Sequence, residues 1–158
     1  RRHNAIVRSA LAEHGGREIK HTGDGIMATC PSAPAAVQAC IDIQRAIASF
    51  NSTNPSIPLE VRIGLNAGEP IVEENDVFGA TVQLAARVCA YGKARQIVCS
   101  QSVVDLSQSK ASLFASLGPV MLKGFREPVP VYEVRWSGNG TGTPIAVSPQ
   151  LSDAIPGS

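Results

Sequence analysis

The nine residues KHTGDGIMA, at positions 20–28, place a carboxylate where it could do chemistry. Asp24-Gly25 stands between two short strand-like segments, and Asp-Gly is a strong signal for a tight β-hairpin turn because both residues tolerate positive φ. A carboxylate at a rigid hairpin tip is also well placed for a hard divalent cation, which prefers oxygen ligands. The local sequence predicts the turn and leaves a metal-binding role of Asp24 open.

A second group of reactive side chains lies in DVFGATVQLAARVCA, residues 76–90. Gln83 and Arg87 are four positions apart, so they share one face of a helix that we expect to begin at Gly79. Asp76 lies just before that helix. The stretch therefore presents a carboxylate, an amide and a guanidinium from one short element. An ordinary solvated helix face, with Asp76 near the positive end of the helix dipole, is the other interpretation.

The elements that position these residues follow from apolar periodicity and from the turn residues. We expect helices at residues 1–14, from 31–34 to about 50, at 79–91 and, capped by Ser100, at 100–106. We expect strands on both sides of Asp24 and at residues 59–65, 71–72, 96–99, 120–123 and 129–136. This order predicts an α+β sandwich, a ferredoxin-like βαββαβ-type fold with helices on a mostly antiparallel sheet. Residues 1–136 form the predicted domain, and residues 137–158, rich in Gly, Pro and Ser, a flexible tail.

Composition limits the classes of function. The 158 residues carry a net charge of +1 and only 4% aromatics, which argues against a nucleic-acid partner. No apolar run approaches the roughly 18 residues of a membrane span, so we expect no membrane contact by this segment. The cysteines stand in apolar stretches without a CxxC pattern, which predicts reduced core thiols and a cytoplasmic location. They are Cys30, Cys40, Cys89 and Cys99.

Four stretches, taken in order, resemble one known family. They are HGGREIKHTGDGIMATCPSAPAAVQACIDIQ, LEVRIGLNAGEPI, DVFGATVQLAAR and MLKGFREPVPVYEV. Their motifs and spacing are similar to the catalytic domain of class III nucleotidyl cyclases, the adenylate and guanylate cyclases, over about residues 6–136. The resemblance implies a lyase that turns ATP into cyclic AMP and pyrophosphate in signal transduction. It also implies two Mg²⁺ or Mn²⁺ ions per site and a head-to-tail homodimer whose partners share each site.

The resemblance assigns the substrate-binding residues. Lys20 matches the lysine that donates to adenine N1, and Asp76 matches the aspartate that accepts from the adenine N6 amino group. This donor and acceptor pair fits adenine, whereas guanine reverses the pattern. Lys123 could approach the triphosphate or could be an exposed lysine at a strand end. Asn66 and Glu69 could line the same cleft.

The resemblance also implies the residues that act on the α-phosphate. Asp24 matches the second metal-binding aspartate, and Arg87 matches the arginine that stabilises charge in the transition state. Gln83 stands where the family has asparagine, one methylene shorter. The family's first metal aspartate, on a strand before the first helix seen here, corresponds to no position of this sequence. A catalytically silent cyclase-like module for dimerisation or nucleotide sensing is therefore the alternative function.

Overall fold

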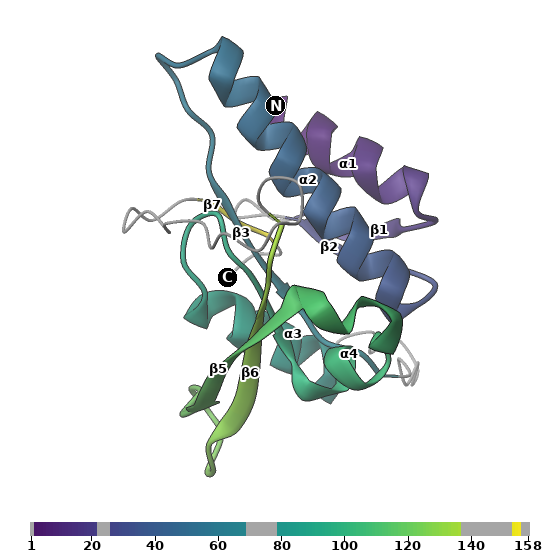
Figure 1. Ribbon diagram of the computed structural model, residues 1–158, viewed down its shortest axis with the longest axis vertical. Helices are drawn as coiled ribbons and strands as arrows, with labels where there is room; N and C mark the ends of the chain where they lie inside the picture. The colour runs from purple at the N-terminus through teal and green to yellow at the C-terminus, as the bar shows by residue number, and fades with distance from the viewer. Residues whose placement is uncertain (1, 22–25, 69–78, 137–152, 156–158) are drawn as a thin grey trace.

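The computed structural model describes residues 2–21, 26–68, 79–136 and 153–155 (Figure 1). Asp24, Asp76 and the strand expected at residues 71–72 lie outside the described residues. Most of the predicted tail lies outside them too. The division into a domain at residues 1–136 and a tail at residues 137–158 stays a prediction.

Two long helices lie side by side, as Figure 1 shows. Helix α1, Arg2–Glu13, ends where Gly15 adopts φ +76° and the Gly16 N–H donates to the Leu11 carbonyl at 2.7 Å. This positive φ favours glycine, which explains why the helix stops at the expected place. Helix α2, Ala33–Thr53, begins after Ser32, whose hydroxyl accepts from the Ala35 N–H at 3.2 Å.

The strands within the described residues form two sheets. Strands β1, Arg17–His21, and β2, Ile26–Thr29, pair antiparallel and confirm the strands of the predicted hairpin. The second sheet has the order β5-β6-β4-β3-β7. Its strands are β3 (Val61–Leu65), β4 (Ile97–Ser100), β5 (Phe114–Val120), β6 (Val129–Val134) and β7 (Asp153–Ile155). Strand β3 runs parallel to β4 and β7, whereas β6 is antiparallel to β4 and β5.

The strand expected at residues 120–123 was placed wrongly. Strand β5 ends at Val120, and Lys123 lies in the exposed turn that follows. Gly118 and Pro119 hide the strand signal in the sequence. The structure accommodates them because β5 is an edge strand, where proline is tolerated, and because the register shifts between Ser116 and Gly118.

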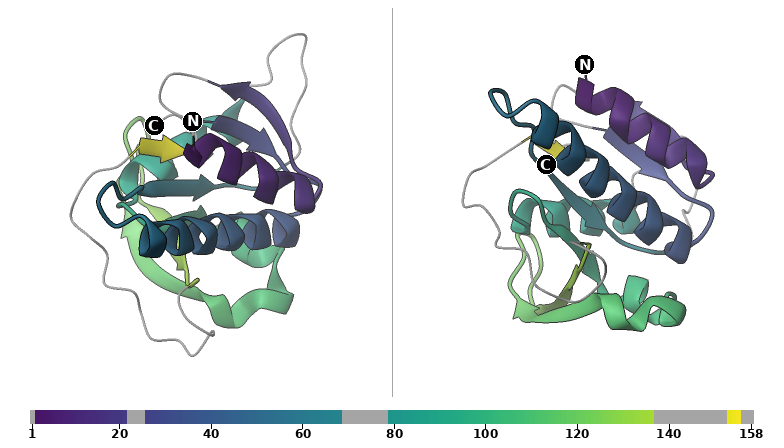
Figure 2. Two further views of the ribbon diagram at one scale, coloured as in Figure 1. Left: turned by 90° about the horizontal axis from the view of Figure 1, so that it is seen from above. Right: turned by 45° about the horizontal axis from the view of Figure 1, so that its top comes forward.

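Alternating side chains of β4 divide the core into two layers. Ile97 and Cys99 belong to the larger buried cluster with α1 and α2, whereas Val98 belongs to a smaller one with Val88 of helix α3, Ala80–Tyr91. Successive strand residues point to opposite faces, so α2 and α3 cover opposite sides of the sheet (Figure 2). The predicted α+β sandwich is confirmed.

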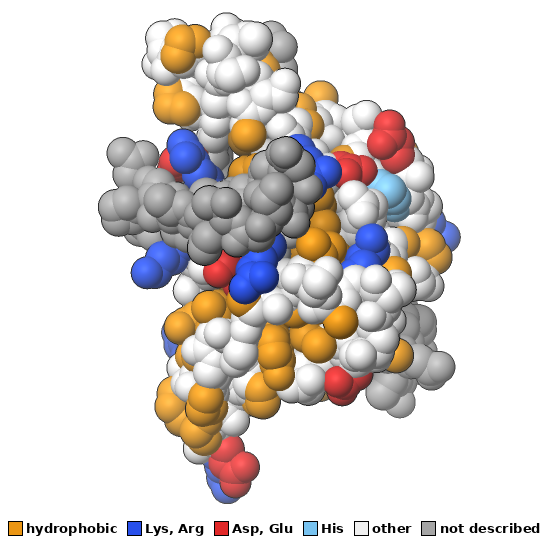
Figure 3. All heavy atoms as spheres, in the orientation of Figure 1, with side chains coloured by type: hydrophobic (Ala, Val, Ile, Leu, Met, Phe, Trp, Pro, Cys, Tyr) orange, Lys and Arg blue, Asp and Glu red, His pale blue; other side chains and the backbone are white. Residues whose placement is uncertain are grey.

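Two short helices complete the described chain: α4, Gln101–Asp105, and the 3₁₀ helix η1, Gln108–Leu113. All four cysteines are free, and three of them are buried, as expected for reduced core thiols. Within the described ranges, no helix combines the length and apolarity that a membrane span requires. On the face shown in Figure 3, basic and acidic side chains are interspersed.

Candidate functional site

Helix α3 carries the candidate catalytic face, and the sheet holds it closely. A Cβ built on Gly64 of β3 would lie 2.5 Å from the backbone nitrogen of Cys89 and 2.6 Å from the carbonyl oxygen of Ala85. The two backbones therefore touch at a position where only glycine fits. At the C-terminal end of the helix, Arg62 Nη1 donates to the carbonyls of Ala90 at 3.4 Å and Gly92 at 3.3 Å. These contacts fix the position of α3 on β3.

Gln83 and Arg87 both lie exposed on this helix. Their spacing of four residues places them on one face, as predicted, while Val88 and Cys89 are fully buried against the sheet. An amide and a guanidinium are thus presented to solvent from a helix that cannot easily move. This arrangement suits a polyanionic ligand, because a guanidinium can donate two parallel hydrogen bonds to phosphate oxygens.

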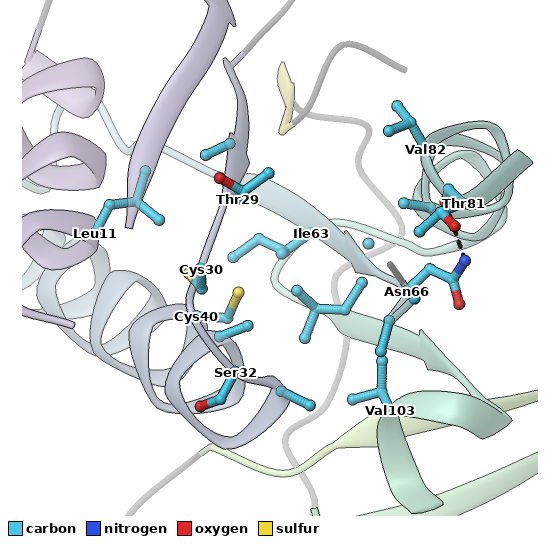
Figure 4. A pocket seen from close by; sticks show the side chains of 18 of the residues that line it. Leu11, Thr29, Cys30, Ser32, Cys40, Ile63, Asn66, Thr81, Val82 and Val103 are labelled. Carbon is cyan, nitrogen blue, oxygen red and sulfur yellow. Dashed lines mark hydrogen bonds between the residues drawn. The ribbon is translucent and has the colours of Figure 1, made fainter. Parts of the chain in front are cut away.

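A cavity of about 480 Å³ opens beside the start of α3 (Figure 4). Its lining comes mainly from apolar side chains of α1, α2, β2 and β3, such as Leu11, Ile43 and Ile63. Gly68 and Gly79 also line it, and they flank residues 69–78, which include Asp76. The two described residues on either side of the stretch with the predicted adenine-binding aspartate therefore both line this cavity.

A polar network stands at the same rim. Asn66 Nδ2 donates to the Thr81 carbonyl at 3.0 Å, and Asn66 Oδ1 accepts from Ser100 at 2.5 Å and from Ser102 at 2.9 Å. Sequence reasoning named Asn66 as a possible cleft residue but missed both serines. The available signal was that Asn66 and Ser100 stand at the carboxyl ends of two neighbouring parallel strands.

The other predicted site residues are placed in part. Lys20 lies on β1, paired with Met27 of β2. Lys123 is exposed in the turn between β5 and β6, next to Leu122, which is buried in the same cluster as Val88 of α3. The structure therefore brings the turn with Lys123 to the layer that contains α3. Asp24 and Asp76 lie outside the described residues.

One group of side chains in the described ranges has the composition of a metal site, but it lies at the end of α1, in the turn after it and on α2. Glu13, His14 and Asp42 have ligand atoms within 4.8 Å of one another. Asp42 already accepts from Gln38 at 3.0 Å and lies 2.6 Å from His14 Nε2. Burial alone would raise the pKa of Asp42, but the hydrogen bonds from His14 and Gln38, with the charges of His14 and Arg45, hold it below its ordinary value. The cluster is thus a hydrogen-bonded contact between the end of α1 and helix α2.

Comparisons with known proteins identify the family. The family model of the adenylate and guanylate cyclase catalytic domain matches residues 1–135. A receptor-type adenylate cyclase of Trypanosoma congolense is 28% identical over 176 residues, covering 84% of this chain and 24% of that protein. The chain spans between 22% and 33% of the length of the first curated relatives that it matches.

Solved structures agree with this match. An adenylate/guanylate cyclase/hydrolase from Silicibacter pomeroyi is 32% identical with a TM-score of 0.73, over 82% of this chain and 76% of that one. The catalytic core of a rhodopsin-guanylyl cyclase with converted specificity, in complex with ATPαS, is 26% identical with a TM-score of 0.69, over 84% and 78%. The fold, the α3 segment and the family match lead to one conclusion: this chain belongs to the adenylate and guanylate cyclase catalytic domain family.

Proposed function

We propose that this domain converts ATP into cyclic AMP and pyrophosphate, working in a head-to-tail homodimer in signal transduction. The observation that supports this most directly is the exposed pair Gln83 and Arg87, held on a helix that is seated on β3 through Gly64. In this reaction the ribose 3′-oxygen forms a bond to the α-phosphorus. The bond from that phosphorus to the bridging oxygen of pyrophosphate breaks, and the 3′-hydroxyl proton is lost to a base.

Arg87 acts on the charge that develops at the α-phosphate. Its guanidinium donates to the non-bridging oxygens, and this interaction strengthens as charge accumulates in the transition state. Gln83, one helical turn earlier, supplies an amide that orients the bound nucleotide. Its side chain is one methylene longer than asparagine, so the amide must fold back to reach the same place. A positioning error of about 1 Å costs on the order of 100-fold in rate.

Lys20 and Asp76 are the proposed reason that adenine is preferred over guanine. Lys20 donates to N1 and Asp76 accepts from the exocyclic amino group, and guanine offers the opposite pattern at both atoms. Lys123, on the turn that packs in the same layer as α3, is proposed to bind the triphosphate. In a head-to-tail dimer these residues and Asp24 would serve sites shared between the two protomers.

The family resemblance implies two Mg²⁺ or Mn²⁺ ions, and the described residues do not form a site for them. In the cluster of Glu13, His14 and Asp42, the Asp42 carboxylate already bonds His14 and Gln38, and the cluster lies at the end of α1 and on α2. Asp24 lies outside the described residues, and one carboxylate does not supply enough oxygen ligands for two such ions. The ions and the role of Asp24 therefore stay predictions, and the steps above use only the chain's own groups.

The alternative is a cyclase-like module that binds nucleotide or dimerises without turnover. Gln83 favours it, because the longer side chain at an exposed helix position has more rotamers to order than asparagine. Such a module would gain thermal stability from ATP with Mn²⁺, by mass action, while no product formed. A rise in the melting temperature without cyclic AMP would therefore support the alternative.

The test of the proposed activity measures cyclic AMP from ATP and Mn²⁺ at a high concentration of the chain, so that dimers form. A double variant, Lys20→Glu with Asp76→Cys, is expected to move the preference from ATP toward GTP. The control, Lys93→Glu with Asp105→Cys, makes the same changes at two exposed positions outside the site. An unchanged ratio of ATP to GTP turnover in the first variant would refute the assignment of Lys20 and Asp76.

A further inference from the structure

Asn66 joins three separate elements through one side chain; Figure 4 shows its bond to Thr81. It follows the last residue of β3, and its Nδ2 donates to the carbonyl of Thr81, in the first turn of α3, at 3.0 Å. Its Oδ1 accepts from Ser100, the last residue of β4, at 2.5 Å and from Ser102 of α4 at 2.9 Å. The carboxyl ends of two parallel strands and the starts of two helices therefore meet at one amide.

The hydroxyl groups of Ser100 and Ser102 make their hydrogen bonds within this network. Ser100 is 3% exposed and stands at the N-cap position of α4, but its hydroxyl does not cap that helix. It donates to Asn66 instead. Ser102 Oγ also accepts from the Ala67 N–H at 3.3 Å and lies 3.1 Å from the Ala67 carbonyl. The chain that leaves β3 is thus anchored at Asn66 and at Ala67.

The network acts on the start of α3. Thr81 stands two residues before Gln83 and six before Arg87 on the same helix. A Cβ built on Gly68 would lie 2.8 Å from Thr81 Oγ1, so the chain after Asn66 passes directly beneath this turn. A shift of the Thr81 carbonyl therefore moves the helix that presents both candidate catalytic residues.

We propose that Asn66 is a positioning residue for the cyclase reaction, an inference that rests on the proposed function. It touches neither nucleotide nor reacting atoms. It holds the first turn of α3 in place, so that the side chains of Gln83 and Arg87 can reach the α-phosphate in the correct orientation. Contacts made mainly in the transition state affect kcat more than KM, and a displacement of about 1 Å costs on the order of 100-fold.

Three variants separate positioning from general stability. Asn66→Ala removes all three hydrogen bonds. Asn66→Asp keeps the acceptor for both serines but turns a carboxylate oxygen toward the Thr81 carbonyl, where a donor is needed. The control is Asn51→Ala, at the end of α2 and away from α3. Asn51 also uses both ends of its amide: Nδ2 donates to the Leu59 carbonyl at 2.7 Å, and Oδ1 accepts from the Leu59 N–H at 2.8 Å.

Steady-state kinetics and hydrogen exchange are measured on each variant in the full chain. We expect both Asn66 variants to lower kcat by about 10- to 100-fold with KM within about threefold. We also expect faster amide exchange in residues 79–84. Asn51→Ala should lower the melting temperature while leaving kcat and that exchange unchanged.

The outcomes distinguish this inference from the proposed function. If the unmodified chain makes no cyclic nucleotide, the proposed function fails, and exchange at residues 79–84 alone decides whether Asn66 holds α3. If Asn66→Asp matches the unmodified chain in kcat and exchange, the positioning role is overturned. It is also overturned if Asn51→Ala lowers kcat as much as Asn66→Ala does.

Discussion

Replacing Gly64 by alanine tests whether the contact between β3 and α3 positions the site. The added Cβ would lie 2.5 Å from both Cβ and N of Cys89 and 2.6 Å from the Ala85 carbonyl oxygen. Carbon atoms in ordinary contact stand about 3.5–4.0 Å apart, so the gap is about 1 Å too short. Two of the three opposing atoms belong to the helix backbone, which cannot rotate away as a side chain can.

The expected loss of stability follows from this geometry. Overpacking of a core costs about 1–3 kcal/mol, and a backbone clash belongs at the upper end, so Gly64→Ala should lower the free energy of unfolding by about 3 kcal/mol. For a domain of this size that corresponds to a fall of about 9 °C in the melting temperature. Moving α3 by about 1 Å displaces Gln83 and Arg87, which should lower cyclic AMP formation by on the order of 100-fold.

The assay is urea unfolding followed by circular dichroism, together with product formation. Gly79→Ala is the control for stability, because Gly79 has φ −72° and a Cβ there meets nothing within 4 Å. Replacing this N-cap glycine by alanine should lower the free energy of unfolding by at most about 1 kcal/mol. The close seating of α3 is refuted if Gly64→Ala unfolds within about 0.5 kcal/mol of the unmodified chain.

Further predictions concern Arg87, Asp42 and the cysteines. Arg87→Lys keeps the positive charge but loses the two parallel hydrogen-bond donors, so kcat should fall about 10- to 100-fold. Because Arg87 is exposed, the melting temperature should not change, and a lower melting temperature would contradict this prediction. Asp42→Asn should cost about 1 kcal/mol of unfolding free energy near neutral pH. Because the folded pKa of Asp42 is lowered, this difference is present above its unfolded pKa of about 3.9 and should vanish as the pH falls through the folded value. A difference in unfolding free energy that stays constant with pH would refute the stabilising role of the Asp42 carboxylate. Burial raises the pKa of Cys99 to about 12, so a thiol reagent at about pH 8 should reach half-buried Cys30 first and Cys99 only after unfolding.

The helices could be predicted closely from the sequence because their signals are local. Gly15 marks a helix end through its positive φ and Ser32 a helix start through its capping hydroxyl, and Gly92 directly follows α3. Strand β5 could not be predicted, because Gly118 and Pro119 suppress the local strand signal. Only its pairing with β6 at the edge of the sheet, a contact distant in sequence, makes that segment a strand.

The candidate site shows the same division between local and distant information. The spacing of Gln83 and Arg87 determines their shared face, so the sequence predicted it and the structure confirms that both are exposed. The contact that positions their helix depends on Gly64 and Asn66, whose partners lie between 15 and 36 residues away along the chain. A glycine in a strand and an asparagine after it are common, and only the parallel pairing of β3 with β4 brings Ser100 to Asn66. Helical periodicity thus predicts which residues share the candidate catalytic face, whereas the residues that position this face can be identified only from the tertiary structure.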